Sequence, residues 1–195
     1  MDTAGNLYVA DQYNHRIRKV TPQGGVSTLA GSNEGGFADG EGSNARFNQP
    51  NGIAVDTAGN LYVADTGNNR IRKITSKGEV STFAGGDEDF AGGDEEADCT
   101  VGLSVARFNG PWGITMDAAG NLYVTDIYYH RVYKVTPDGK ISALAGGCGY
   151  GDFADGEGSN ARFNHPIGIA IDAAGNLYVA DSRNRRIRKI EIRRP

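Results

Sequence analysis

The chain has 195 residues with a formal net charge of −4, and 29 of its residues are glycine. This share is about twice the usual ~7%, which disfavours long helices and favours short strands joined by tight turns. We find no transmembrane stretch and no signal peptide, and the acidic balance does not predict nucleic-acid binding. Cys99 and Cys148 are too few for a disulfide scaffold, and the sequence does not decide whether they pair.

Internal repeats organise the whole chain. Residues 2–11 recur identically at 56–65, and close copies begin at Asp117 and Asp172. A second block, residues 37–48, returns unchanged at 153–164. These copies indicate a single repeat domain over residues 1–195. Its units cover roughly residues 1–50, 51–111, 112–166 and 167–195.

Each complete repeat is predicted to hold four short strands, which we call a to d in chain order. In the second repeat they cover residues 52–56, 61–66, 70–75 and 80–84. Strands a and b are nearly continuous apolar runs, as expected where both faces of a sheet are covered. Repeated four-stranded units of this length predict an all-β fold, a β-propeller in which each sheet is one blade.

The motifs of these repeats resemble those of a known family. Gly52-Ile53-Ala54-Val55-Asp56, followed by residues 60–65 and 68–74, resembles the NHL repeat, and the linker at 37–50 resembles that of bacterial NHL proteins. The resemblance implies a propeller, usually of six blades. It implies no single function, because such propellers include peptide-, protein- and RNA-binding modules, extracellular sensors and a few lyases. It points to an extracytoplasmic setting without deciding the compartment.

The predicted ring is incomplete within one chain. The first repeat lacks strand a and the last lacks strand d, which leaves 14 predicted strands in about 3.5–4 repeat units. A six-bladed ring needs about 24 strands. Two interpretations stay open: the chain is a fragment of a longer propeller, or two copies form a homodimer that closes a ring.

The loops between strands b and c differ among the repeats, whereas the a–b turns are near copies. Variation on a repeated frame marks positions that the fold does not dictate, and Tyr and Arg are common binding anchors. We therefore predict a non-catalytic binding or scaffold module whose b–c and d–a loop face recognises a peptide, a protein or a glycan. The predicted ligand-binding residues are Tyr13, His15, Asn69, Trp112, Tyr128, Tyr129, His130, Arg183 and Arg185.

Catalysis is left open but disfavoured, and we predict no cofactor and no metal site. A metal-dependent lyase or hydrolase is the first alternative, yet His15, His130 and His165 lack the spacing of a zinc site. Residues 39–44 offer oxygen atoms at alternate positions without the fuller calcium-loop pattern. The acidic insertion at 87–96 is predicted to be a solvated loop.

An RNA-binding module is the second alternative. Arg-Ile-Arg-Lys at 16–19, 70–73 and 186–189 would form its basic stripe, although the net negative charge argues against it. The Asp-x-x-Asn-x-Arg pattern at 11–16, 65–70 and 181–186 predicts a charge-assisted clamp in which the Asp that ends strand b holds the Arg that opens strand c.

Overall fold

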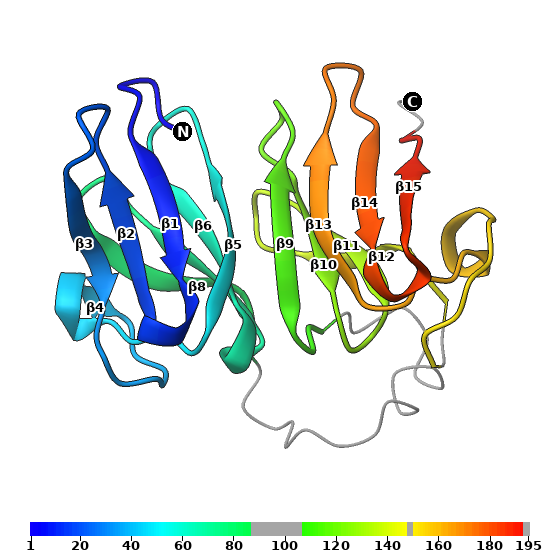
Figure 1. Cartoon of the computed structure of the whole chain (residues 1–195), viewed down its shortest axis with the longest axis horizontal. Coiled ribbons are helices and arrows are strands. Elements are labelled where there is room, and N and C mark those ends of the chain that lie inside the picture. Colours follow the sequence, from blue (N-terminus) through cyan, green and yellow to red (C-terminus); the bar gives the residue numbers. More distant parts are fainter. Residues whose placement is uncertain (87–106, 148–149, 193–195) are drawn as a thin grey trace. The chain divides into compact units, whose positions relative to one another are not determined.

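The computed structural model describes residues 1–86, 107–147 and 150–192 (Figure 1). The chain forms two compact units, Met1–Gly86 and Asp87–Pro195, which we call the N-terminal and C-terminal units. Regular structure in the described residues consists of β-strands and single turns of 3-10 helix, which confirms the all-β prediction. No helix among these residues is long and apolar enough to cross a membrane.

The N-terminal unit contains two antiparallel sheets, which are blades 1 and 2 (Figure 1). Blade 1 has the order β1-β2-β3 and lacks strand a, and blade 2 has the order β4-β8-β7-β6-β5. The strands are β1 (Leu7–Asp11), β2 (Arg16–Val20), β3 (Val26–Gly31), β4 (Gly40–Glu41), β5 (Pro50–Val55), β6 (Leu61–Asp65), β7 (Arg70–Ile74) and β8 (Glu79–Gly85). Two short helices follow strands b, η1 (Gln12–Asn14) and η3 (Thr66–Asn68), and η2 (Gly42–Asn44) lies in the linker between the blades.

The C-terminal unit contains blades 3 and 4. Blade 3 has the order β12-β11-β10-β9, and blade 4 has the order β13-β14-β15 without a fourth strand among the described residues. The strands are β9 (Pro111–Met116), β10 (Leu122–Asp126), β11 (Arg131–Val135), β12 (Ile141–Ala145), β13 (Pro166–Ile171), β14 (Leu177–Asp181) and β15 (Arg186–Ile190). The short helices are η5 (Gly158–Asn160) and η6 (Ser182–Asn184). The predicted strands are present among the described residues, where β4 and the short 3-10 helices are the elements that the sequence did not predict.

Each unit has its own apolar core between its two blades. In the N-terminal unit, Ile17 of blade 1 and Val63 of blade 2 pack with Ala45 and Phe47 of the linker. In the C-terminal unit, Ala161 and Phe163 take the same places between blades 3 and 4. The linkers are therefore part of the core as well as connections.

The repeated a–b turn is a hydrogen-bonded structure. In blade 2, Oδ1 of Asp56 accepts bonds from the backbone N–H groups of Ala58 and Asn60 at 3.0 and 2.8 Å. Gly59 has a φ of 81°, which glycine adopts without steric cost. In blade 1 the equivalent bonds, above all that from the Asn6 side chain, lower the pKa of Asp2 to about 2. Turn geometry thus explains why this sequence recurs in every blade.

Candidate functional site

Every b–c loop ends in the same backbone conformation, but the side chain at this position is His in two blades, Asn in one and Arg in one. The last loop residue is left-handed in all four blades, with φ values of 54°, 52°, 54° and 55° at His15, Asn69, His130 and Arg185. Asn tolerates this conformation well, whereas other residues adopt it at a cost. The frame is therefore constrained at this position while its chemistry varies.

A buried aspartate at the end of strand b holds the loop face of blade 2 together. Oδ1 of Asp65 accepts the Asn48 backbone N–H at 2.7 Å, and Oδ2 accepts Nδ2 of Asn68 at 2.8 Å and Nη1 of Arg72 at 2.9 Å. Arg72, which is fully buried, also pairs with Asp39 of the linker. Burial raises the pKa of Asp65 in spite of these partners.

Blade 4 repeats this network in the C-terminal unit. Asp181 accepts the Asn164 backbone N–H at 2.7 Å and Nη1 of Arg188 at 3.0 Å. Arg188 reaches Asp155 of the linker at 2.5 Å. The Asp-Gly-Glu segment that offered oxygen atoms for a cation thus supplies the counter-ion of an arginine in both units.

The predicted clamp has a different arginine from the one expected. Asp65 pairs with Arg72, not with Arg70, which lies directly opposite it in the strand register. Arg70 instead donates to the carbonyl of Gly86 at 2.6 Å and stacks on the ring of Phe37, with Cζ 3.8 Å from the ring centroid. Because Arg72 and Arg188 are buried in ion pairs, the basic stripe of the RNA-binding alternative loses one cation per repeat at these strands.

Blade 3 departs from this pattern. Tyr133 stands at the position of Arg72, and the buried Asp126 accepts backbone N–H groups of Asn109 and Tyr129 at 2.6 and 2.9 Å. Burial raises the pKa of Asp126 to about 7, against the effects of these hydrogen bonds and of the charge of Arg131.

His130 and His165 join neighbouring loops of the C-terminal unit by hydrogen bonds. The backbone N–H of His165 donates to Nδ1 of His130 at 3.1 Å, and the carbonyl of His165 accepts Oγ of Ser182 at 2.5 Å. Burial, helped by His165 and the charge of Arg183, lowers the pKa of His130 to about 4. A neutral ring suits its role as an acceptor. His15 accepts the backbone N–H of Gln49 at 3.0 Å in the same way.

Next to these two histidines lies a surface that we call the C-terminal loop patch, made of Tyr128, His165, Arg183 and Arg185. The Tyr128 ring, 47% exposed, meets His165 edge-on with centroids 6.3 Å apart. Arg183 and Arg185 are exposed on the next loop. From the sequence, His165 is considered only as a possible zinc ligand and is not among the predicted ligand-binding residues.

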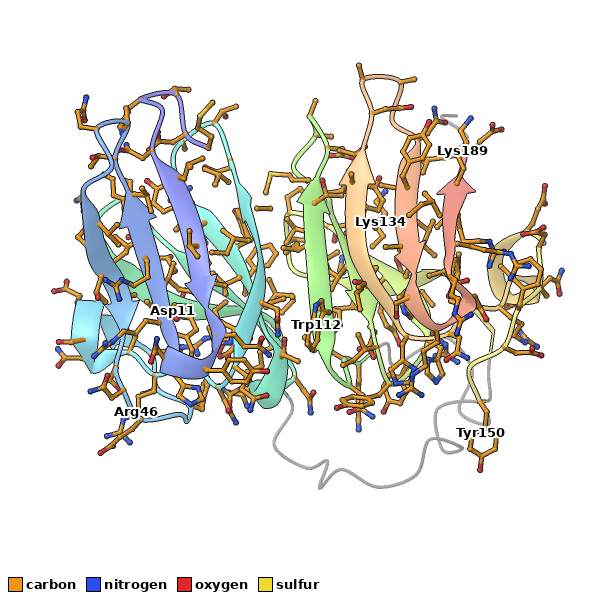
Figure 2. The ribbon with its side chains drawn as sticks, viewed as in Figure 1. Asp11, Arg46, Trp112, Lys134, Tyr150 and Lys189 are labelled. Carbon is orange, nitrogen blue, oxygen red and sulfur yellow. The ribbon has the colours of Figure 1, made fainter. Side chains whose placement is uncertain are left out.

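The predicted binding residues thus fall into separate groups. Tyr13 is 82% exposed on the N-terminal unit, and Tyr128, Arg183 and Arg185 are exposed on the C-terminal unit. Tyr129 and His130 are buried and hold the loop from within. The remaining three are half-buried: His15, Asn69 and Trp112, the last of which lies on β9 (Figure 2). Of the nine, Tyr13, His15 and Asn69 belong to the N-terminal unit, and the other six belong to the C-terminal unit.

Comparison with known proteins agrees with this architecture. The sequence matches the NHL repeat at residues 47–74, 108–132 and 163–190. The chain belongs to the NHL-repeat family. NHL repeat-containing protein 2 of Bos taurus is 34% identical over 156 residues, which cover 76% of this chain and 21% of that protein. The chain therefore spans about a fifth of this curated relative.

Solved structures share the fold of this NHL chain. A protein of unknown function from Bacteroides thetaiotaomicron is 25% identical, with a TM-score of 0.72 over 97% of this chain and 45% of that one. A streptogramin B lyase is 15% identical, with a TM-score of 0.61 over 98% of this chain and 52% of that one. At this identity the lyase shows the fold alone, which is that of β-propeller blades.

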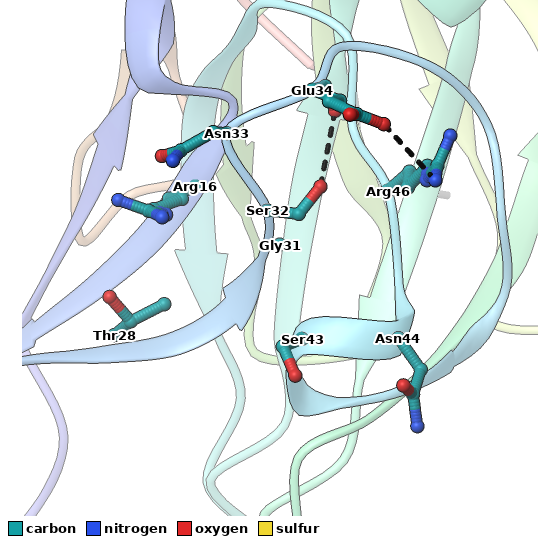
Figure 3. Close-up of a pocket in the computed structure, with 9 residues that line it drawn as sticks. All are labelled: Arg16, Thr28, Gly31, Ser32, Asn33, Glu34, Ser43, Asn44 and Arg46. Atoms are coloured by element: carbon teal, nitrogen blue, oxygen red, sulfur yellow. Dashed lines mark hydrogen bonds and ion pairs between the residues drawn. The ribbon is translucent and has the colours of Figure 1, made fainter.

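A polar hollow lies in the N-terminal unit of this NHL chain (Figure 3). It has a volume of about 630 Å³ and lies between β2, β3 and the linker. Arg46 and Glu34 form an ion pair across it at 3.2 Å, and Oγ of Ser32 donates to the Glu34 carbonyl at 3.3 Å. Because Glu34 already pairs with Arg46, this arginine is not free to bind an anionic ligand.

In residues 1–86, 107–147 and 150–192, no three His, Cys, Asp or Glu side chains lie close enough together to hold an ion. Cys99, Cys148 and the acidic insertion at 87–96 lie outside the described residues.

Proposed function

We propose that this NHL chain is a non-catalytic binding module whose C-terminal loop patch takes an acidic segment of a protein partner. Arg185 carries the proposal. It adopts the left-handed conformation with an exposed side chain, for which we find no hydrogen bond or ion pair to the described residues. His15 and His130 at the same position fix neighbouring backbone, so the fold uses those side chains but not this one.

The chemistry around Arg185 supports an acidic ligand. Arg183 is exposed beside it, and Asp181, which precedes the loop, is buried against Arg188. Two arginines can bind carboxylates with paired hydrogen bonds, and Tyr128 adds rigid aromatic contact area. The loops are fixed by buried hydrogen bonds, which lowers the entropic cost of binding.

The test uses peptides selected from a random displayed library against the immobilised chain. We expect selected peptides to be rich in Asp and Glu. A synthetic copy should bind the double variant Arg183→Ala, Arg185→Ala at least tenfold more weakly, because hot-spot arginines commonly contribute about 2 kcal/mol or more. Isothermal titration calorimetry measures the affinities.

Lys140→Ala is the control, because Lys140 is also an exposed cation, on the c–d turn of blade 3, where it pairs with Asp138 at 3.0 Å. It should bind as the unchanged chain does. Equal affinity of the double variant and the control would contradict the peptide assignment. Retention of a neutral glycan or of RNA, without retention of acidic peptides, would favour the two other ligand classes instead.

We propose further that two copies associate through blade faces that are open in one chain. Leu7, Val9 and Val26 of blade 1 are 50%, 46% and 59% exposed. Their counterparts in blade 2, Leu61, Val63 and Val80, are buried against blade 1 in the core of the N-terminal unit. On blade 4, Ile187 is 70% exposed, whereas its counterpart Ile17 is buried.

These two open faces therefore repeat the two faces that pack together between blades 1 and 2. Blade 1 of one copy fits blade 4 of the other, and two such contacts close a pair. Light scattering on a sizing column should give twice 20.7 kDa at micromolar concentrations. Val9→Lys should restore the monomer, and Lys140→Ala should not. A monomer across the whole concentration range would contradict this association.

A further inference from the structure

The aspartates that end strand b are fully buried in blades 2, 3 and 4, and one of the three has no ion pair. Asp65 of blade 2 pairs with Arg72 at 2.9 Å. Asp181 of blade 4 pairs with Arg188 at 3.0 Å. Asp126 of blade 3 has no such pair in the part of the chain that the structure describes, and its carboxyl group accepts backbone N–H groups. Blade 3 therefore buries a carboxyl group without a paired cation.

The difference arises from one residue of strand c. Tyr133 stands at the position of Arg72 and lies on β11, which is the neighbour of β10 inside the sheet of blade 3 (Figure 1). Its ring meets that of Phe108 in the linker edge-on, with centroids 5.5 Å apart. In blade 2, Cζ of Arg72 lies 5.2 Å from the ring of Phe47, the equivalent linker residue. An aromatic ring thus replaces the guanidinium group on the face of the sheet that holds the carboxyl group.

Asp126 holds the b–c loop of blade 3, residues 127–130, against the linker. Its Oδ1 accepts the backbone N–H groups of Tyr128 and Tyr129 at 3.2 and 2.9 Å. Its Oδ2 accepts the backbone N–H of Asn109 in the linker at 2.6 Å. The loop and the linker therefore meet at a single carboxyl group that is closed off from water.

The charged form of this carboxyl group is costly while the loop is closed. Burial raises the pKa of Asp126 to about 7, and the charge of Arg131, which lies opposite it in register, lowers the pKa without cancelling this effect. β9 places Pro111 opposite Asp126, and the other ionisable groups on the described elements around it are Tyr133 of β11, Tyr128, Tyr129 and His130 of the loop and Arg107 of the linker. A hydrated aspartic acid has a pKa of about 4, so water would stabilise the charged form.

We propose that the b–c loop of blade 3 is a pH-sensitive element, which stays closed over Asp126 while this carboxyl group is protonated and opens more readily once the group is charged. Opening lets water hydrate the carboxylate, and the neutral acid gains far less from that hydration. The open state therefore binds fewer protons than the closed state, so its population rises between about pH 5 and about pH 8. The loop of blade 4 does not share this response, because Arg188 pairs with Asp181 in the closed state.

The opening changes the C-terminal loop patch, because Tyr128 lies on this loop. Its ring meets that of His165 edge-on, with centroids 6.3 Å apart, only while the loop is closed against the linker. The patch therefore keeps the described arrangement best at acidic pH. This opening is independent of the ligand proposed for the patch, since it is measured on amides of the loop and the linker with no ligand present.

Hydrogen exchange followed by NMR on the full 195-residue chain measures the opening. Protection factors, which correct for the intrinsic exchange rate at each pH, should fall about tenfold or more at Tyr129 and Asn109 between about pH 5 and about pH 8. The matched control in the same molecule is the amide of Asn164, which donates to Asp181 at 2.7 Å and should change by less than about threefold. Carbon-detected NMR should place the titration midpoint of the Asp126 carboxyl group near neutral pH.

Two variants test the cause. Asp126→Asn removes the charge at every pH, and Tyr133→Arg supplies the cation of blades 2 and 4, so each should give Tyr129 the same protection at both pH values. Protection at Asn164 shows that each variant is folded, and exchange in the unchanged chain decides the question by itself if a variant is not. The proposal is overturned if protection at Tyr129 does not fall with rising pH, or if Asp126→Asn keeps the fall. An equal fall at Asn164 also overturns it, because global unfolding and not loop opening would then respond to pH.

Discussion

Replacing Arg72 by methionine should lower the free energy of unfolding by about 3–5 kcal/mol. The substitution removes the cation that pairs with both Asp65 and Asp39, and it leaves Asp65 charged in a fully buried place. Breaking a buried ion pair from one side costs more than the pair itself contributes, because the remaining charge stays desolvated. Urea unfolding followed by circular dichroism measures the loss.

Arg18→Met is the matched control. Arg18 stands at the same position of blade 1, but its pair with Asp11 is longer, 3.5 Å, and partly exposed. Such pairs contribute about 0–1 kcal/mol, so the control should be nearly as stable as the unchanged chain. Adding Asp65→Asn to Arg72→Met should recover part of the loss, since no unpaired charge then remains. Equal losses for Arg72→Met and Arg18→Met would show that the buried network is not the cause.

Replacing Phe47 by alanine should have an effect of similar size, about 3–5 kcal/mol. The ring is fully buried in the core of the N-terminal unit, and it lies 5.2 Å from the guanidinium of Arg72. Its removal leaves a cavity between two blades that cannot collapse without shifting a sheet. Thermal and urea unfolding of the variant measure this effect.

Phe37→Ala is the control that distinguishes the effect of core packing on stability from the effect of ring stacking on arginine. Phe37 belongs to the same linker and stacks on Arg70 and Arg72, but it is partly exposed. A stacking contact of this kind contributes about 0.5–1 kcal/mol at exposed sites, so this variant should lose far less stability. If Phe37→Ala were as destabilising as Phe47→Ala, cation stacking and not core packing would hold the linker in place.

The fold was predictable from the sequence because its signals are local and repeated. The Asp-x-Ala-Gly-Asn turn, the apolar strands that follow it and the charged strand c recur in register. What escaped prediction depends on contacts across the chain. β4 exists only because Gly40 lies against Val80, and no local pattern announces a strand of two residues.

The candidate site was predictable only in part, for the same reason. Variation among the b–c loops identified Tyr128, Arg183 and Arg185, which are exposed. The same variation did not show that Tyr129, the residue after Tyr128 in this loop, is buried. Asp65 and Arg70 are opposite in register and share one face of the sheet with Arg72, which lies two residues further along strand c. Register alone did not show that Arg72 takes the carboxylate while the Gly86 carbonyl and the Phe37 ring hold Arg70.

The contacts of the linkers bear on how an array of repeated blades can gain or lose a blade. Its Ala45 and Phe47 complete the core behind it, and its Asp39 neutralises the arginine of the blade ahead. A segment running from one linker to the next therefore carries these core and ion-pair contacts with it. Duplicating or deleting that whole segment preserves each junction, as in other proteins built from nearest-neighbour modules. Copying of this stretch would lengthen the array while keeping these linker contacts, and the linkers at 37–48 and 153–164 are identical over 12 positions.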